Sequence, residues 1–438
     1  MLKTSDFRIF NLIKEEEKRL KETLQMIPSE NYPSKAVLQA LGSVFNFKYS
    51  EGYPLGRYYQ GNKFADQVEL TAEERAKKLF GVPHVNVQPY SGSPANTAIY
   101  FALLTPGKDK ILGLSLAFGG HLTHGSPVSF SGKYFNVVSY KLNDKGFLDY
   151  DEIERIALKE KPKIIVCGAT AYPQKIDFKR FGQIADKVGS YLLADISHIA
   201  GLVAAGVHES PVPYVHLVMT TTHKTLRGPR GAMIMVTKKG LKKDPDLAKK
   251  IDKAVFPGLQ GGPHDNQTAG IAVALNEASK ASFKKYGAQI VKNSKKLAEE
   301  LNKYGFNLIS GGSDNHLILI NLANKKVNGA VAALALEMGG IIVNKNAVPD
   351  DKMPPFYPSG IRMGTPAITT RGMKEKDMVK IAKWIKEIID ECPTDTLPDT
   401  KEKRARFWES YKRGVTKNKK LKAIKKEVKE FCLKFPLP

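Results

Sequence analysis

The chain has 438 residues, of which 42% are hydrophobic and 26% charged, a balance ordinary for a globular protein with room for about two or three domains. It contains no apolar run of the roughly eighteen residues that a membrane helix needs, and its charged start lacks the apolar stretch of a secretory signal. The cysteines, Cys167, Cys392 and Cys432, are too few and too far apart for a disulfide framework or a zinc site. We therefore expect reduced thiols in a cytoplasmic protein without a membrane span.

The formal net charge of +24 is the unusual feature of the composition. Between residues 401 and 434 there are fourteen Lys or Arg against four Glu, and a second basic run covers residues 238–253. Such charge attracts polyanions such as RNA or a polyglutamylated ligand, or it simply forms solvated faces. We favour solvated faces because no nucleic-acid motif accompanies the charge, so nucleic-acid binding is not expected as the main function.

The first predicted element is a helix over residues 7–25, followed by an irregular segment. From about residue 67, amphipathic helices alternate with short apolar strands, which predicts an α/β domain with a largely parallel sheet covered on both faces. The predicted helices cover residues 68–80 and 95–104, and the predicted strands cover residues 85–87, 111–114, 163–167, 191–194, 215–219 and 232–236.

The pattern changes after the Gly- and Pro-rich residues 257–263. Helices are predicted over residues 268–286, 288–304 and 374–390, and strands over 317–321 and 341–343, which indicates a smaller α+β domain. A proline-containing turn at 392–398 leads to a basic terminal helix. The predicted division is an N-terminal helix and interface segment (1–50), a large α/β domain (51–270), a small C-terminal α+β domain (271–391) and a basic helical tail packed on the small domain (392–438).

Reactive side chains follow several predicted strands at the edge where open α/β sheets bind ligands. Asp195 and His198 follow the strand 191–194, and Lys224 lies in a run of threonines after the strand 215–219. Residues 91–93, Ser-Gly-Ser, open a helix after the strand 85–87.

Each of these features alone has an ordinary structural explanation. A lysine after a strand is usually solvated, an aspartate there is often a helix cap, and a Ser-Gly-Ser turn is mainly an N-cap. Together they supply an amine, a carboxylate and a set of N–H groups that can hold a phosphate, which is what pyridoxal phosphate requires. The sequence contains no Walker A motif, no G-x-G-x-x-G after a strand, no G-x-S-x-G and no second His after His208-Glu209, so no metal site is expected.

Longer motifs occur in order at residues 28–31, 48–54, 119–125, 195–201, 220–225, 255–263 and 359–366. In these motifs the chain resembles the serine hydroxymethyltransferases, fold-type-I pyridoxal-phosphate enzymes with an aspartate-aminotransferase-like large domain. The resemblance covers about residues 24–390. It departs at Pro28, where the family usually has alanine, and at Gln60, where glycine is common.

The resemblance implies that Lys224 holds pyridoxal phosphate as a Schiff base and is displaced by the amino group of serine. Asp195 would pair with the pyridine nitrogen, His198 would lie near the ring hydroxyl, and His121 would stack on the ring. The other positions implied to contact the cofactor are Ser91, Gly92, Ser93, Thr170, His223 and Tyr49, together with Gly262 from a neighbouring subunit.

The implied reaction is the reversible transfer of the hydroxymethyl carbon of serine to tetrahydrofolate, giving glycine and 5,10-methylenetetrahydrofolate. Arg362 and Ser29 would bind the substrate carboxylate, Tyr59 would lie close to the substrate, and Glu51 would transfer protons at the hydroxymethyl group. The positions implied to bind the pterin are Leu116, Gly120, Leu122 and Asn346. The resemblance also implies a homodimer or tetramer in which Tyr49 and Glu51 cross the interface. An aldolase that needs no pterin is the nearest alternative, and the segment 116–122 disfavours it.

Overall fold

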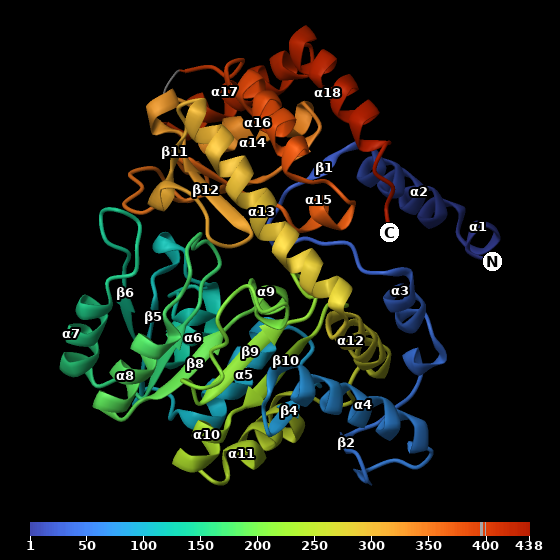
Figure 1. The fold of residues 1–438 in the computed structure, drawn as a ribbon, viewed down its shortest axis with the longest axis vertical. Coiled ribbons are helices and arrows are strands. Elements are labelled where there is room, and N and C mark those ends of the chain that lie inside the picture. Colours follow the sequence, from blue (N-terminus) through green and yellow to red (C-terminus); the bar gives the residue numbers. More distant parts are fainter. Residues whose placement is uncertain (395–396, 399) are drawn as a thin grey trace. The chain divides into compact units, whose positions relative to one another are not determined.

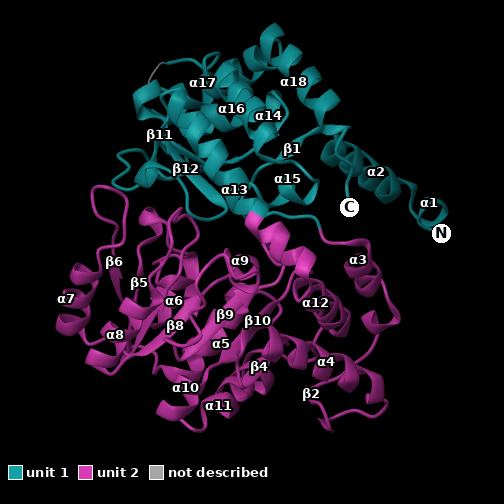
Figure 2. Cartoon of the chain, viewed as in Figure 1, with its two compact units in different colours: residues 1–32, 289–438 teal, residues 33–288 magenta. Residues whose placement is uncertain are grey.

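The computed structural model describes residues 1–394, 397, 398 and 400–438 of the chain. The chain forms two compact units, one of residues 33–288 (unit 2) and one of residues 1–32 and 289–438 (unit 1), which Figure 2 distinguishes by colour. The proline-containing turn predicted at 392–398 lies partly outside the described residues.

Unit 2 is built on a seven-stranded sheet with the order β4-β10-β9-β8-β7-β5-β6 (Figure 1). Strands β6, β5, β7, β8 and β9 run parallel to one another, whereas β10 is antiparallel to both β9 and β4. The predicted, largely parallel sheet is therefore confirmed. The strands are β4 (His84–Asn86), β5 (Lys110–Leu114), β6 (Asn136–Tyr140), β7 (Ile164–Cys167), β8 (Tyr191–Asp195), β9 (Leu217–Thr221) and β10 (Ala232–Val236).

Strand β9 begins and ends two residues later than predicted. Its last two residues, Thr220 and Thr221, pair with Met233 and Ala232 of β10, so the ladder continues into the threonine run. The sequence pattern predicted these threonines to lie in the loop because they are polar. Lys224 consequently lies only three residues beyond the end of the strand.

Helices cover the sheet on both faces. Helices α5 and α11 bury Ile99 and Ile251 in a core with Leu193 and Leu217 of the sheet, and α8 packs on β7 and β8. The helices of unit 2 are α3 (Lys35–Leu41), α4 (Lys63–Phe80), α5 (Gly92–Leu103), α6 (Phe130–Tyr134), α7 (Tyr150–Glu160), α8 (Phe178–Val188), α9 (Ala200–Ala204), α10 (Lys238–Lys243), α11 (Leu247–Lys253) and α12 (Asp265–Ala278), with the π-helix η4 (Ala254–Leu259).

Helix α5 begins at Gly92, three residues before its predicted start. Ser91 is fully extended, with φ −165° and ψ 179°, and precedes the helix without a side-chain cap bond. Pro94 is tolerated in the first turn because the N–H that proline lacks would have no partner within the helix there. The earlier start places the N–H groups of the Ser-Gly-Ser turn at the helix N-terminus.

Unit 1 is an α+β structure around an antiparallel sheet with the order β11-β12-β15-β14. Its core gathers buried side chains such as Leu297, Ile320, Ile361 and Trp384. The elements are α1 (Leu2–Ser5), α2 (Phe7–Glu22), β1 (Leu24–Gln25), β11 (Asn307–Leu308), β12 (Leu317–Asn321), α14 (Gly329–Met338), β13 (Ile341–Ile342), β14 (Asn344–Asn346), β15 (Gly360–Gly364), α15 (Pro366–Thr370), α16 (Glu375–Ile389), α17 (Lys401–Val415) and α18 (Lys419–Cys432).

Three predicted helices need correction. The helix predicted over 7–25 ends at Glu22, because Leu24 and Gln25 form a strand that pairs with β13. The helix predicted over 268–286 is interrupted at residues 279–280, and helix α13 (Ala281–Lys303) begins in unit 2 and ends in unit 1. The basic tail forms two helices, the second of which is capped by the Asn418 side chain.

Arg371 joins distant segments of unit 1. Arg371 is 5% exposed, and its guanidinium donates to the carbonyls of residues 20, 21 and 23 in the last turn and C-cap of α2. It also donates to the carbonyl of Cys432, the last residue of α18, and to that of Phe435 just beyond it. Carbonyls at helix C-termini lack partners within the helix, and a cation there is favoured by the helix dipole. This residue therefore closes the ends of two helices at once.

Among the described residues, no helix combines the length and the apolarity that crossing a bilayer requires. Cys167, Cys392 and Cys432 are all buried and form no disulfide.

Candidate active site

Asp195 ends strand β8 and is the centre of a buried hydrogen-bond network in unit 2. Its Oδ2 atom accepts from Nε2 of His124 at 3.0 Å and from Nδ2 of Asn96 at 3.2 Å, and its Oδ1 accepts from the Ser197 N–H at 3.1 Å. The Nδ1 atom of His124 accepts from the His121 N–H at 3.4 Å, which leaves Nε2 as the donor toward the carboxylate.

This network keeps the Asp195 carboxylate ionised. Burial alone would raise the pKa of Asp195, but the hydrogen bond from His124 outweighs burial and lowers that pKa below its usual range. The sequence interpretation gave no role to His124, which lies inside the motif 119–125, or to Asn96, which follows the Ser-Gly-Ser turn by three residues. Both could have been found from the sequence, because each is a polar residue about one helical turn after a predicted site residue.

His121 is part of the same network and is neutral. Asn96 donates to the Thr123 hydroxyl at 2.8 Å, and that hydroxyl lies 2.7 Å from the His121 Nδ1 atom. Burial lowers the pKa of His121 to about 4, helped by nearby His124 and Lys224 and opposed by Asp195. The predicted amine and carboxylate therefore both lie near enough to His121 to influence its pKa.

The loop that carries Lys224 is fixed on both sides. The Thr222 hydroxyl donates to Pro229 O at 2.7 Å, and the Thr225 hydroxyl donates to His198 O at 3.0 Å. His198 is 5% exposed, and Lys224 itself is partly buried. Hydrogen bonds from both neighbouring threonines therefore restrict the backbone from which the lysine extends.

Polar atoms without partners lie beside this loop. Among the described residues, Nδ1 of His223 and Oγ1 of Thr221 are buried without a hydrogen-bond partner. A Cβ added to Gly92 would lie 2.8 Å from the Thr221 methyl group, so the turn before α5 closely approaches the end of β9. Burial, with the charges of Lys224 and Arg230, lowers the pKa of His223 to about 3. Buried polar groups normally have partners, so these atoms fit a phosphate group well.

Two further residues predicted to contact the cofactor, Ser93 and Thr170, differ in their surroundings. Ser93 is exposed, and its carbonyl accepts from the Thr97 hydroxyl. Thr170 follows strand β7, and its N–H donates to Gly119 O at 2.8 Å, which attaches it to the loop before His121.

The residues predicted to bind the pterin in unit 2 border His121. Leu116 and Leu122 are 46% and 45% exposed, and they lie in the short helices η2 (Leu116–Phe118) and η3 (Leu122–His124). Gly120, between them, is buried, and a Cβ there would lie 1.9 Å from Leu114 O, so a side chain would not fit. Two apolar side chains therefore remain available for contact with a flat ring.

Tyr49, Glu51 and Tyr59 form a second cluster in unit 2. The rings of Tyr49 and Tyr59 meet edge to face at 5.3 Å, and both side chains are about half exposed. Tyr49 borders Gly262, and a Cβ on Gly261 would lie 3.0 Å from the Glu51 carboxylate. Three predicted residues, together with Gly262, therefore come together near the molecular surface.

Three predicted substrate residues belong to unit 1. Arg362, in β15, is 6% exposed, and its Nε donates to Oδ1 of Asn344 at 3.1 Å. Burial lowers the pKa of Arg362 to about 10, which still leaves it charged near pH 7. Ser29 is partly buried in a turn, and Asn346 in β14 donates to Ala347 O.

An amine and an ionised carboxylate near one neutral imidazole, together with the partnerless buried atoms of Thr221 and His223 in the described chain, suit the chemistry of pyridoxal phosphate. With the mainly parallel sheet that positions them, they define the class of protein as a fold-type-I transferase that works with this cofactor.

Comparison with known proteins narrows the class. The chain belongs to the serine hydroxymethyltransferase family, whose model matches residues 2–385. It is 53% identical over 437 residues to the serine hydroxymethyltransferase of Desulfotalea psychrophila, covering 100% of this chain and 96% of that protein. It is 56% identical over 388 residues to the enzyme of Acidothermus cellulolyticus, covering 88% and 89%.

Members of this family interconvert serine and glycine with tetrahydrofolate. The chain is accordingly a pyridoxal-phosphate-dependent transferase of one-carbon metabolism that carries out this reaction.

Proposed function

We propose that Lys224 holds pyridoxal phosphate, with Asp195 at the pyridine nitrogen, His121 on the ring face and His198 at the ring hydroxyl. The observation that carries this assignment is that neighbouring strands end in the ionised Asp195 and in Thr221, which, like His223 just after it, has a buried atom without a partner in the described chain. His223 and the Ser91–Gly92 turn would hold the phosphate, and Ser93 and Thr170 are proposed as further cofactor contacts. When bound, the cofactor supplies an electron sink for cleavage of the Cα–Cβ bond of serine.

The residues around the ring act by fixing charge. Asp195, oriented by His124 and Asn96, keeps a proton on the pyridine nitrogen because its own pKa is too low for it to take that proton. His121 stacks as a neutral ring and adds no positive charge beside the protonated nitrogen.

Arg362 is proposed to bind the substrate carboxylate, assisted by Ser29. A buried guanidinium that stays charged makes a planar, bidentate pair with a carboxylate, and the bond to Asn344 limits its rotation. Glu51 is proposed to move the proton of the serine hydroxyl, with Tyr59 close by. Leu116, Gly120, Leu122 and Asn346 are proposed to bind the pterin.

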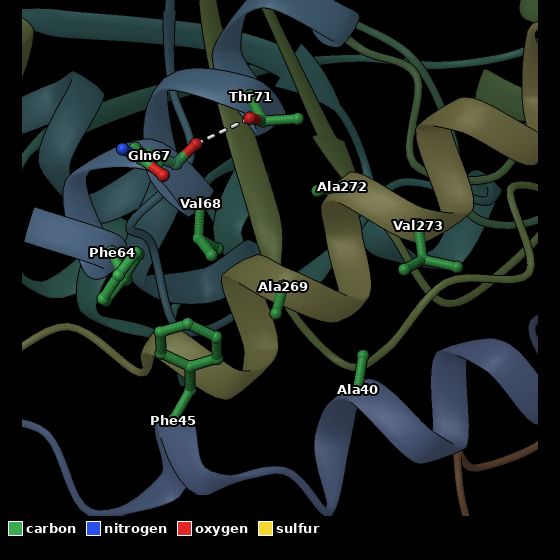
Figure 3. Close-up of a pocket in the computed structure, with 9 residues that line it drawn as sticks. All are labelled: Ala40, Phe45, Phe64, Gln67, Val68, Thr71, Ala269, Ala272 and Val273. Carbon is green, nitrogen blue, oxygen red and sulfur yellow. Dashed lines mark hydrogen bonds between the residues drawn. The ribbon is translucent and has the colours of Figure 1, made fainter.

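We also infer a homodimer or a dimer-based tetramer in which Tyr49, Glu51 and Gly262 complete the site of a second copy. The segment around them exposes large apolar side chains and borders an apolar hollow of about 460 Å³ (Figure 3). A second copy would cover this surface, because contiguous exposed apolar patches mark interfaces. The exposed side chains are Leu38, Val44, Phe47, Leu55, Tyr58 and Phe64, and the hollow is lined by Ala40, Phe45, Phe64, Gln67, Val68, Thr71, Ala269, Ala272 and Val273.

Two experiments test these assignments. Purified protein incubated with pyridoxal phosphate should become yellow, and Lys224→Ala should lose the covalent link; a colourless wild type would contradict the lysine assignment. Serine cleavage should slow sharply when tetrahydrofolate is omitted, whereas an unchanged rate would favour a pterin-independent aldolase.

Mixing two inactive variants tests sharing between subunits. Lys224→Ala and Glu51→Ala should restore part of the activity after subunit exchange, because a mixed dimer contains one intact site. No recovery despite demonstrated exchange would place Glu51 in the site of its own chain.

A further inference from the structure

The side chain of Arg57 holds the backbone on both sides of Glu51. Its Nη1 atom donates to Ser50 O and to Gly52 O, each at 2.8 Å, and the side chain is 3% exposed. The carbonyl of Glu51 itself accepts from the Tyr58 N–H at 3.0 Å. The two residues that flank Glu51 are thus attached to a single buried guanidinium.

Two carboxylates of helix α4 fix this guanidinium in turn. Arg57 Nε lies 2.8 Å from Asp66 Oδ1, and Arg57 Nη2 lies 2.6 Å from Glu69 Oε2. Gln88 extends the network, because its Nε2 donates to Glu69 Oε1 at 2.8 Å and to Gly52 O at 2.9 Å. The hairpin that carries Glu51 is therefore connected to α4 and to the segment after β4.

The hairpin depends on this network for its shape. Strands β2 (Gly52–Tyr53) and β3 (Gly56–Arg57) have two residues each, and isolated hairpins of this kind are marginal in water. Leu55, with φ 67°, lies in the left-handed region that disfavours its side chain, and its N–H donates to Asp66 Oδ2 at 3.1 Å. Buried ion pairs often add little net stability, so positioning accounts better for this cluster.

We propose that Arg57 is a positioning residue that directs the Glu51 carboxylate for proton transfer through the clamp of Asp66, Glu69 and Gln88. This inference rests on the proposed role of Glu51. Lysine at position 57 keeps the charge but cannot reach two carbonyls and two carboxylates together, because it lacks the planar fork of arginine.

A double-mutant cycle with the holoenzyme tests the proposal. Arg57→Lys should lower kcat about thirtyfold and leave the KM for serine within about twofold, and Glu51→Gln should be slower still. The double variant should be no slower than Glu51→Gln alone, because Arg57 acts through Glu51. Arg75→Lys is the matched control. Arg75 lies on α4, the helix that carries Asp66 and Glu69, but it donates to Ala272 O away from the hairpin. The kcat of this variant should match that of the wild type.

Hydrogen exchange supplies a readout that is independent of turnover. In full-length Arg57→Lys the Tyr58 amide should exchange about tenfold faster than in the wild type, and in Arg75→Lys it should not change. If Arg57→Lys does not fold, Asp66→Asn removes one arm of the clamp and enters the same cycle.

The outcomes separate the two ideas. If Glu51→Gln is slow and the two substitutions lower kcat independently, so that their effects multiply in the double variant, the role of Glu51 stands and only the positioning role of Arg57 is overturned. A Glu51→Gln variant at the wild-type rate would overturn the role of Glu51 and the positioning inference together.

Discussion

Two buried charges, Asp195 in unit 2 and Arg371 in unit 1, are held in opposite ways. Arg371 directs its donors to five backbone carbonyls at the ends of helices α2 and α18. Asp195 accepts from the side chains of His124 and Asn96, and Oδ1 of Asn96 is buried with no partner among the described residues.

The difference distinguishes a structural charge from a functional one. We expect a charge that is held mainly by backbone carbonyls to serve stability, and a charge that is held mainly by side chains at a strand end to serve ligand binding. The same contrast separates two histidines. Nδ1 of His216 accepts from the Leu192 N–H at 2.9 Å, while Nδ1 of His223 is among the buried atoms without a partner in the described chain.

The largest expected effect comes from Asp195→Asn. The amide cannot keep a proton on the pyridine nitrogen, so kcat for serine should fall about a thousandfold, with the midpoint of thermal unfolding little changed. Steady-state kinetics and calorimetry would measure the two effects. A large loss of stability with normal turnover would make Asp195 a structural charge and break the comparison.

Arg371→Met should show the reverse pattern. Removing the guanidinium leaves several buried carbonyls without donors and should cost about 4 kcal/mol of unfolding free energy, with kcat unchanged in the folded protein. Denaturant titration at fixed protein concentration measures the stability. A loss of turnover in folded protein would show that Arg371 has a functional role.

The stability of the cofactor-free protein should depend on pH through His216. Burial lowers the pKa of His216 from 6.5 to about 4, so the unfolded chain binds a proton at a higher pH than the folded chain. Stability that is present above pH 6.5 is therefore lost as the pH falls toward 4, by about 1.5 kcal/mol between pH 6.5 and 5. His216→Gln should reduce this slope in denaturant titrations at the two pH values; an equal slope would assign it to other groups.

The smallest effect is expected at His223. Inorganic phosphate should raise the unfolding temperature of the cofactor-free protein, and His223→Asn should weaken phosphate binding about fivefold. His216→Gln is the matched control, because its ring nitrogen already has a backbone partner. Equal phosphate protection in both variants would mean that the partnerless atom of His223 is not part of the cradle.

The parallel sheet could be predicted from the sequence, because each strand of unit 2 is a short continuous apolar run and these runs alternate with helices. The sequence also singled out Asp195 and Lys224, since both follow strands closely. The strand β15 was missed because Gly360, Arg362 and Gly364 interrupt its apolar pattern.

Partners that are distant in sequence were out of reach. Arg371 contacts residues about 350 positions earlier, and no local pattern announces such a bond. The sequence analysis gave no role to Arg57, because Asp66 and Glu69 become its partners only after folding. His124 and Asn96 were visible, but a polar residue within a motif does not indicate which carboxylate it will meet.

The Arg371 junction has a consequence for synthesis on the ribosome. Residues 20–25 leave the ribosome first, yet their guanidinium partner and strand β13 follow more than 300 positions later. At about 5–20 residues per second this interval lasts roughly 15–70 seconds. During that time unit 2, which is continuous in sequence, can fold, while Leu24 and Met26, which are fully buried in folded unit 1, still lack their partners. The nascent chain is therefore expected to attract chaperones at the segment after helix α2.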